Sequence, residues 1–304
     1  MTTPVEIKVM AILIHERSAG LPAIKRGRPN YCTCPCAAFA TCWISTKSAR
    51  PEHTGRWAKS RREKRKRTIN KCRGNRLRPL TNHLPKPLLP IGEFPLIYYN
   101  LFLLKKYGIT DVLINVHYHA EKLIQALGDG AALGLSITYS EETTILGTGG
   151  GMKNMESALG GGAFLVMNGD ILVDLNLDKM VAFHQSKKGI ATLALREDPD
   201  VLQYGPIDLD ANNQIQNILG KIPSKKGRLR RRMFTGIHVI EPRAFDYIPG
   251  GVLYSITDAY IEMLKKGEKL FGYAMTGYWA DIGLPKRYHE VNQEMKEGKI
   301  SPAC

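Results

Sequence analysis

The chain has 304 residues, of which 43% are hydrophobic and 23% charged, a composition typical of a folded globular protein. Its early apolar run, residues 9–14, is far shorter than the roughly 18 residues of a membrane-spanning helix and lacks the flanks of a signal peptide. Six cysteines are too few for a disulfide scaffold, so we expect a cytoplasmic protein without a membrane span.

The net charge of +15 is concentrated near the N-terminus. Residues 1–73 contain 17 lysines and arginines against 4 acidic residues, whereas residues 74–304 contain 26 against 24. Five of the six cysteines also lie in the first stretch. We therefore separate an anomalous basic, cysteine-containing N-terminal segment, residues 1–73, from a main domain, residues 74–304.

Three interpretations of the N-terminal segment stay open. Cys32, Cys34 and Cys36 would be metal ligands, but their spacing matches no usual zinc site. The basic run 59–67 would hold nucleic acid by neutralising phosphates. Residues 15–73 show no helical or strand periodicity, so we prefer a disordered, solvated extension and do not expect nucleic acid as a partner.

From residue 74 onward, helical and strand-like segments alternate between short breaks rich in Gly, Pro, Asp and Asn. In chain order we expect a helix at 95–107, a strand at 111–116, a helix at 120–127, a strand at 137–139, a helix at 148–159, a strand at 164–167, a helix at 177–188, strands at 190–195 and 235–240, a helix at 255–266, a strand at 270–275 and a helix at 285–296. This alternation is typical of an α/β domain with a mostly parallel sheet. No repeat of 20–50 residues is present, which excludes a solenoid domain.

A basic loop opens the main domain. Gly74 allows a close backbone approach to a phosphate, and Arg76, Arg78 and Lys86 supply positive charge beside it. Prolines on both sides of Lys86 keep its backbone extended, which limits the entropy lost when the ammonium is positioned. Such a loop is often only surface, so its meaning depends on the other motifs.

A glycine cluster precedes the helix expected at 148–159. In the sequence 146–151, LGTGGG, we expect backbone N–H groups, those of Gly149 and Gly150 among them, to be free to meet an anion or a base edge. Glycine clusters also form plain turns, so this signal is weak alone.

Two aspartates follow strand-like segments far apart in the chain. Asp170 comes two residues after the apolar run 164–167, and Asp281 lies between an aromatic pair and Gly283. In open α/β sheets ligands bind beyond the carboxyl ends of the strands. If both aspartates meet at that edge, they would bridge a magnesium ion to phosphate groups, as phosphoryl and nucleotidyl transfer require.

Taken together and in this order, the motifs of residues 74–304 resemble those of the sugar-1-phosphate nucleotidylyltransferases, or NDP-sugar pyrophosphorylases. The matching motifs are RLRPLT (76–81), PKPLLPIG (85–92), LGTGGG (146–151), NGD (168–170), FTGIHVI (234–240), YSITDAY (254–260) and YWADIG (278–283). The chain is most similar to short bacterial enzymes that act on mannose-1-phosphate or N-acetylmuramate-1-phosphate.

The resemblance implies a Rossmann-like, glycosyltransferase-A-like fold, a three-layer sandwich with a mostly parallel mixed central sheet. It also implies transfer of a nucleotide from an NTP to a sugar-1-phosphate, which gives an NDP-sugar and pyrophosphate. Asp170 and Asp281 would carry Mg²⁺, while Arg76 and Lys86 would be catalytic, at the triphosphate and at the reacting phosphates. Gly74 would contact the nucleotide.

The same resemblance places the remaining site residues. Gly149 and Gly150 would lie against the base or ribose, and Asn168 near the sugar or ribose. Thr235 and Gly236 would line the sugar side. The base, the sugar and the choice between monomer and homo-oligomer stay open at this point.

The family's first strand and its glycine-rich start are absent where the pattern requires them. Cys72 stands in place of the first glycine, and the preceding residues 60–67 are almost all charged, which excludes them from a buried parallel sheet. Either the apolar stretch 7–14 supplies this strand, or residues 1–73 are read from a wrong frame.

The family's Glu-Lys-Pro motif is also incomplete, because Gly220 stands in the glutamate position before Lys221. Lys221 is therefore a candidate sugar-phosphate contact that rests on a partial match. Two alternatives to an active enzyme follow from these departures. One is a catalytically impaired relative that binds sugar phosphate or a partner without turnover, and the other is nucleic-acid binding through residues 59–67.

Overall fold

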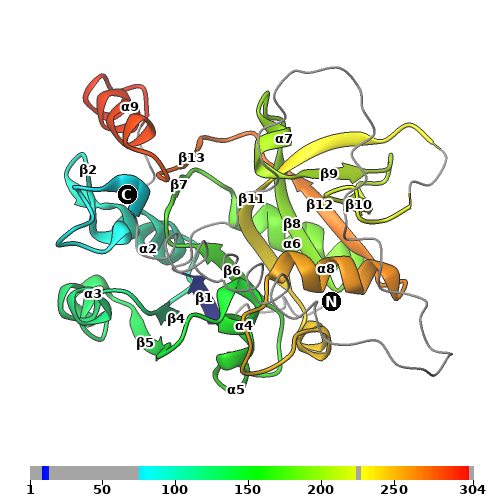
Figure 1. The fold of residues 1–304 in the computed structure, drawn as a ribbon, viewed down its shortest axis with the longest axis horizontal. Helices are drawn as coiled ribbons and strands as arrows, with labels where there is room; N and C mark the ends of the chain where they lie inside the picture. The colour runs from blue at the N-terminus through cyan, green and yellow to red at the C-terminus, as the bar shows by residue number, and fades with distance from the viewer. Residues whose placement is uncertain (1–8, 14–74, 224–226, 301–304) are drawn as a thin grey trace, which may run out of the picture.

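The architecture is built on a mixed sheet of nine strands, as far as residues 9–13, 75–223 and 227–300 show, which are those that the computed structural model describes (Figure 1). The sheet order is β10 (Ile215–Ile218), β9 (Pro206–Leu209), β11 (Arg230–Ile240), β6 (Phe164–Asn168), β1 (Val9–Leu13), β4 (Asp111–Val116) and β5 (Ser136–Glu141), with β8 (Ala191–Arg196) beside β11 and β12 (Leu270–Ala274) beside β8. Pairing is parallel from β6 through β1 and β4 to β5 and between β8 and β12. The long strand β11 pairs antiparallel with β6, β8 and β9, and β9 with β10, so the sheet is mixed as expected.

The strand at the centre of the parallel region comes from the N-terminal segment. β1 pairs with β4 on one side and β6 on the other, with Leu13 opposite both Asn115 and Asn168. The apolar stretch 7–14 therefore does supply the first strand of the sheet. The cysteines and the basic run 59–67 lie outside the described residues, and so do the positions on which the disorder and reading-frame interpretations depend.

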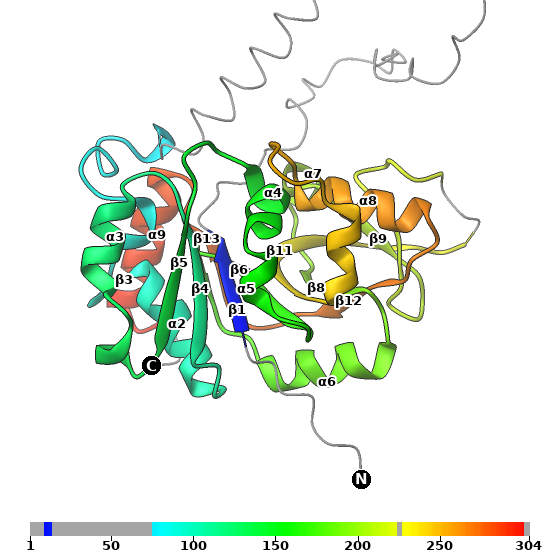
Figure 2. The same cartoon turned by 90° about the horizontal axis from the view of Figure 1, so that it is seen from below.

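Helices cover both faces of the sheet, which produces three layers. One face carries α2 (Leu96–Lys106), α3 (Ala120–Leu127) and α6 (Leu177–Lys187), and the other carries α4 (Gly147–Asn154), α5 (Glu156–Leu159) and α8 (Ile256–Lys265). Figure 2 shows β4 and β1 between α2 and α3 on one side and α4 and α5 on the other.

Strand β6 illustrates how the sequence builds both cores. All five of its residues are buried, and successive side chains point to opposite faces of the sheet. Leu165 and Met167 pack in the core beneath α2 and α6, while Phe164 and Val166 pack in the core beneath α4 and α8. A strand buried on both faces is expected to be a continuous apolar run, as this one is.

Smaller elements complete the fold on both sides of the sheet. They are α7 (Val201–Tyr204), α9 (Pro285–Lys296), the strand pair β7 (Ile171–Val173) and β13 (Trp279–Asp281), the pair β2 (Pro90–Ile91) and β3 (Phe94–Pro95), and the 3-10 helices η1 (Asn75–Leu77), η2 (Lys86–Leu88), η3 (Ala131–Leu133) and η4 (Pro242–Tyr247). A third apolar cluster joins α9 to β7, β13 and the start of α2. Among the described residues, none of the helices has the length and apolar character needed to cross a membrane.

Side-chain caps mark the start of two helices. The Asn176 side chain accepts the N–H of Lys179 and begins α6, and the Ser255 hydroxyl accepts the N–H of Thr257 and begins α8. The expected strand 111–116 and helices 120–127 and 285–296 have the observed bounds. The expected helix 148–159 is instead two helices, which meet at Met155.

Protonation of His238 should destabilise this fold. His238 is buried on β11 and shares a hydrogen bond with the Tyr260 hydroxyl, and burial lowers its pKa from 6.5 to about 3. The unfolded chain therefore binds the proton more readily, and stability falls as the pH drops below 6.5. From about pH 7.5 to about pH 5 this residue should remove about 2 kcal/mol of unfolding free energy.

Urea unfolding at the two pH values measures the loss. His238→Gln cannot take up the proton, so its loss over the same interval should be smaller than that of the unchanged protein by about 2 kcal/mol. An equal loss in both proteins would contradict the assignment to His238.

Candidate active site

Polar side chains gather where the parallel strands end. Asn115 on β4 and Asn168 at the end of β6 lie on either side of Leu13, the last residue of β1. Both asparagines are buried. The chain continues to β4 on one side of β1 and returns at β6 on the other, so this edge is a topological switch point, where open α/β sheets bind ligands.

Glu142, which the sequence analysis did not single out, belongs to the same edge. Its carboxylate is buried, with Oε1 accepting from Asn115 Nδ2 at 2.8 Å and Oε2 accepting from the backbone N–H of Leu146 at 2.9 Å. The side chain thus fastens the loop before α4 to β4. Its place directly after β5 is the one signal in the sequence that could have identified it.

The structure brings Asp170 and Asp281 together. Asp170 immediately precedes β7, Asp281 ends β13, and the two strands pair antiparallel with Asp281 opposite Ile171. The N–H of Ile282 also donates to the backbone carbonyl of Asp170 at 3.1 Å. Two carboxylates from distant parts of the chain therefore share one position at the edge of the sheet.

The Lys86 ammonium lies between these carboxylates. Its Nζ is 2.6 Å from Asp170 Oδ2 and 3.6 Å from Asp281 Oδ1, and the Lys86 and Asp170 side chains are each only 7% exposed. Pro85, directly before η2, and Pro87, within η2, flank Lys86. Buried charges require partners, and one cation compensates both carboxylates here. Asp281 Oδ1 is buried and accepts no hydrogen bond from any described residue.

Arg76 borders the same place from η1. A side-chain carbon built on Gly283 would lie 3.1 Å from Asp281 Oδ1 and 3.5 Å from Arg76 Nη2, so the missing side chain leaves space between the guanidinium and the carboxylate. Arg76 itself is exposed. Gly74, the other candidate in this loop, lies outside the described residues.

The glycines of α4 serve close packing. The N–H groups of Gly149 and Gly150 both donate to the carbonyl of Tyr254, at 2.9 and 3.1 Å. A side-chain carbon on Gly150 would lie 2.5 Å from the carbonyl oxygen of Val252. The expectation that these two amides are free to bind an anion is therefore wrong, although a nucleotide role for the residues stays a prediction.

Asn168 and Gly236 lie in direct contact. A side-chain carbon on Gly236 would come within 2.5 Å of Asn168 Nδ2, and Gly236 has a φ of 86°, in the left-handed region. The neighbouring Thr235 is fully buried, and its hydroxyl donates to the Ala194 carbonyl at 2.8 Å. Its own carbonyl accepts from Trp279 Nε1 at 2.9 Å, which connects β11 to β13.

Lys221 lies on the loop after β10. It is exposed, and its charge partly offsets the effect of burial, which raises the pKa of Asp258 on α8. Asp258 lines a cavity of about 140 Å³ together with Leu219 and Phe234. Since Phe234 precedes Thr235 on β11, the cavity adjoins the predicted sugar side.

Comparison with known proteins agrees with this geometry. A family model described as nucleotidyl transferase matches residues 72–298. The chain belongs to the nucleotidyl transferase family. The matched residues include Asp170, Asp281, Lys86 and Arg76, and they begin after β1.

Two of the curated relatives have related names. The UTP–glucose-1-phosphate uridylyltransferase of Synechocystis sp. is 33% identical over 75% of this chain and 63% of its own length. The mannose-1-phosphate guanylyltransferase of Mycobacterium tuberculosis is 32% identical over 76% of this chain and 64% of its own length. The resemblance to sugar-1-phosphate nucleotidylyltransferases is thus confirmed. The chain spans under two thirds of the length of these two relatives.

Solved structures confirm the Rossmann-like fold. A Bacillus anthracis protein assigned as a glucose-1-phosphate thymidylyltransferase, solved with sucrose, has a TM-score of 0.64 and 27% identity, covering 73% of this chain and 90% of its own. An apo UDP-glucose pyrophosphorylase has a TM-score of 0.60 over 75% of this chain and 96% of its own, and at 21% identity it supports the fold alone.

Gly236→Ala should destabilise the protein. The substitution forces a side-chain carbon against Asn168 and strains a left-handed backbone, so we expect a loss of about 1–3 kcal/mol in urea unfolding. Gly161→Ala is the matched control, because nothing lies within 4 Å of the carbon it adds. If both variants unfold at the same urea concentration, the contact with Asn168 does not constrain residue 236.

Proposed function

We propose that the protein transfers a nucleotide from an NTP to a sugar-1-phosphate and releases pyrophosphate. The observation that carries this proposal is the Lys86 ammonium held 2.6 Å from Asp170 and 3.6 Å from Asp281, at the carboxyl edge of the sheet. This group of charges offers both a positive donor for phosphates and a carboxylate pair for a cation. The names of the relatives support the same reaction class.

The reaction is an in-line displacement. An oxygen of the sugar phosphate forms a bond to the α-phosphorus of the NTP, and the bond from that phosphorus to the bridging oxygen of pyrophosphate breaks. Lys86 would bind the phosphates at the reacting centre and Arg76 the triphosphate, which neutralises the charge that accumulates there. No general base is needed, because a phosphate monoester is already anionic at neutral pH.

Asp170 and Asp281 would hold Mg²⁺. Carboxylate oxygens are ligands that this ion prefers, and the Asp281 Oδ1 atom is buried without a hydrogen-bond donor among the described residues. In that part of the chain no group of three or more acidic, His or Cys side chains gathers, so phosphates and water would complete the coordination. When bound, the ion supplies Lewis-acid stabilisation of phosphate oxygens.

The substrates would lie on either side of the Lys86 group, by which we mean Lys86, Asp170 and Asp281. Gly149 and Gly150 would form the packed wall against the base or ribose, while Asn168 and Gly236 would contact the sugar or ribose. The Thr235 hydroxyl already donates to β8, so Thr235 would not bind the sugar through this group. It would instead hold the part of β11 that lines the sugar side of the site.

Lys221 would reach the sugar phosphate from the loop after β10. We further propose that residues 74–304, together with β1, form the nucleotidyltransferase domain, and that the protein acts in the cytoplasm. A relative that binds sugar phosphate without turnover is the alternative that the first assay separates.

Pyrophosphate release tests the proposal. Five nucleotides, UTP, GTP, dTTP, CTP and ATP, are each combined with glucose-, mannose- and N-acetylmuramate-1-phosphate in the presence of Mg²⁺. We expect release with a restricted set of pairs, and a fall of at least about 100-fold in kcat for Asp170→Asn and for Asp281→Asn, since each removes a carboxylate from the reacting centre.

Asp246→Asn is the matched control, because it removes an exposed carboxylate at η4 and should keep full activity. Release that survives in both aspartate variants would refute the placement of the site. Binding of sugar phosphate without release from any pair would favour the alternative without turnover.

Lys86→Met should strengthen binding of a divalent cation in the absence of nucleotide. The ammonium and the cation compete for the same two carboxylates, so removing the ammonium should lower the Kd for Mn²⁺ by about tenfold, while turnover falls. Electron paramagnetic resonance of free Mn²⁺ measures this directly. Lys179→Met, an exposed substitution on α6, should change neither property, and an unaltered Kd in Lys86→Met would show that the carboxylates are not the cation site.

A further inference from the structure

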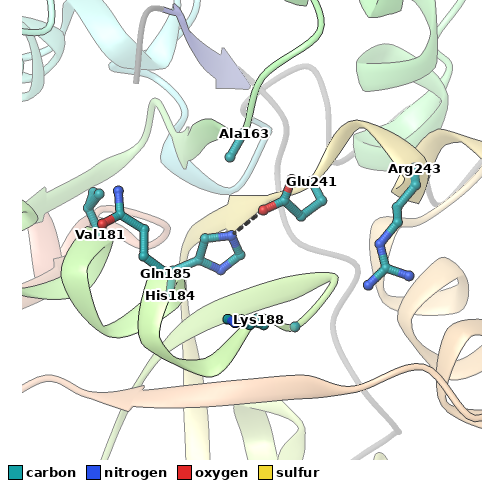
Figure 3. Close-up of a pocket in the computed structure, with 8 residues that line it drawn as sticks. Ala163, Val181, His184, Gln185, Lys188, Glu241 and Arg243 are labelled. Carbon is teal, nitrogen blue, oxygen red and sulfur yellow. Dashed lines mark hydrogen bonds and ion pairs between the residues drawn. The ribbon is translucent and has the colours of Figure 1, made fainter. Parts of the chain in front are cut away.

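A second cavity, of about 320 Å³, lies at the opposite edge of the sheet from the aspartates (Figure 3). Its wall includes Ala163, which immediately precedes β6, and the last turn of α6. Asp170 follows the other end of β6, so the five-residue strand separates the two places by roughly 16 Å. None of the residues lining this cavity belongs to the nucleotide or sugar sites proposed above.

A buried histidine holds a carboxylate at the wall of this cavity. His184 Nε2 lies 3.1 Å from Glu241 Oε1, and His184 Nδ1 lies 2.8 Å from the Thr192 hydroxyl. Burial lowers the pKa of His184, so the ring is neutral at pH 7 and donates from Nε2 to Glu241. The Glu241 side chain is 36% exposed, which leaves the fixed carboxylate accessible as an acceptor.

Two cations stand around this pair. Lys188 follows α6 with a left-handed backbone, and its ammonium makes no ion pair or hydrogen bond with another described residue. Arg243 Nη1 donates to both carboxylate oxygens of Glu268, at 2.7 and 2.6 Å, which orients the guanidinium. Figure 3 shows Lys188 on the His184 side of the His184–Glu241 pair and Arg243 on the Glu241 side, with Gln185 next to His184 on α6.

We propose that this cavity binds a small polyhydroxylated anion of the sugar-phosphate class. Lys188 and Arg243 would hold the anionic group, because both line the cavity and both carry charged N–H donors. Glu241 would accept from hydroxyl groups of the ligand. A volume of about 320 Å³ is at the lower end of small-molecule pockets, as a hexose phosphate requires.

The charge pattern favours this class over its simpler parts. Inorganic phosphate alone would leave the exposed Glu241 carboxylate without a ligand donor, and this fixed carboxylate would repel it. An uncharged sugar would leave the Lys188 ammonium uncompensated. A ligand with an anionic end and a hydroxyl-bearing body satisfies both sides of the cavity at once.

Calorimetric titration with glucose 6-phosphate, inorganic phosphate and glucose as probes tests the proposal. Glucose 6-phosphate has no phosphate at the anomeric position, so it is not a substrate of the proposed reaction. We expect it to bind more tightly than either of the other probes. It should also protect Lys188, but not Lys179, from acetylation by acetic anhydride, as measured by mass spectrometry.

Variants locate the binding. Lys188→Ala and Arg243→Ala should each raise the Kd for glucose 6-phosphate by about tenfold, since each removes a charged hydrogen-bond donor. Lys179→Ala, which removes an exposed lysine from the other end of α6, should leave it unchanged. Asp170→Asn should also leave it unchanged, which separates this site from the active site whether or not the protein turns over.

Four outcomes would overturn the proposal. They are the absence of binding at millimolar glucose 6-phosphate, equal binding of glucose, an equal loss of affinity in Lys179→Ala, and an unaltered Kd in Lys188→Ala. Arg243→Ala also removes the ion pair with Glu268 and could lower the stability of the protein. The Kd of Lys188→Ala tests the proposal without this complication.

Discussion

A buried cluster of opposite charges sets the strictest requirement on this structure. Removing an ammonium and two carboxylates from water is expensive unless the three groups compensate one another at short distance. The Lys86 group satisfies that requirement only because three distant parts of the chain arrive together: the proline-flanked η2, the end of β6 and the β7–β13 pair. Much of the packing around α2 and α9 supports those three backbones, through the apolar cluster that includes Leu96, Leu172 and Ile282.

The sequence revealed the parts of this site whose signals are local. A run such as residues 164–167 followed by a glycine and Asp170 indicates a strand that ends at a carboxylate, and the fold follows from the periodicity of such runs. The cap residues Asn176 and Ser255 lie directly before helices that were expected to begin there. The strand 111–116 and the helix 120–127 also have the bounds that their sequence patterns predict.

Other features depend on tertiary contacts that no local pattern encodes. The glycines at 149 and 150 predict free amides when only the helix start is considered, whereas the Tyr254 carbonyl from a distant loop takes up both. Glu142 carries no motif of its own, and its role as a clamp exists only because β4 and β5 are parallel neighbours. The short strands β7 and β13 have three residues each, too few for a periodic signal, yet they align the two aspartates.

The position of β1 has a consequence for how the protein can be handled. The change in composition near residue 73 indicates a domain boundary there. However, β1 is hydrogen-bonded on both sides, to β4 and to β6. A fragment that starts after this strand would have a gap in the middle of its sheet, with two facing edges of unpaired N–H and C=O groups. Such edges recruit strands from other molecules, so the truncated chain would be prone to self-association. By the same logic, a short peptide with the sequence of residues 9–13 is the natural ligand for that gap.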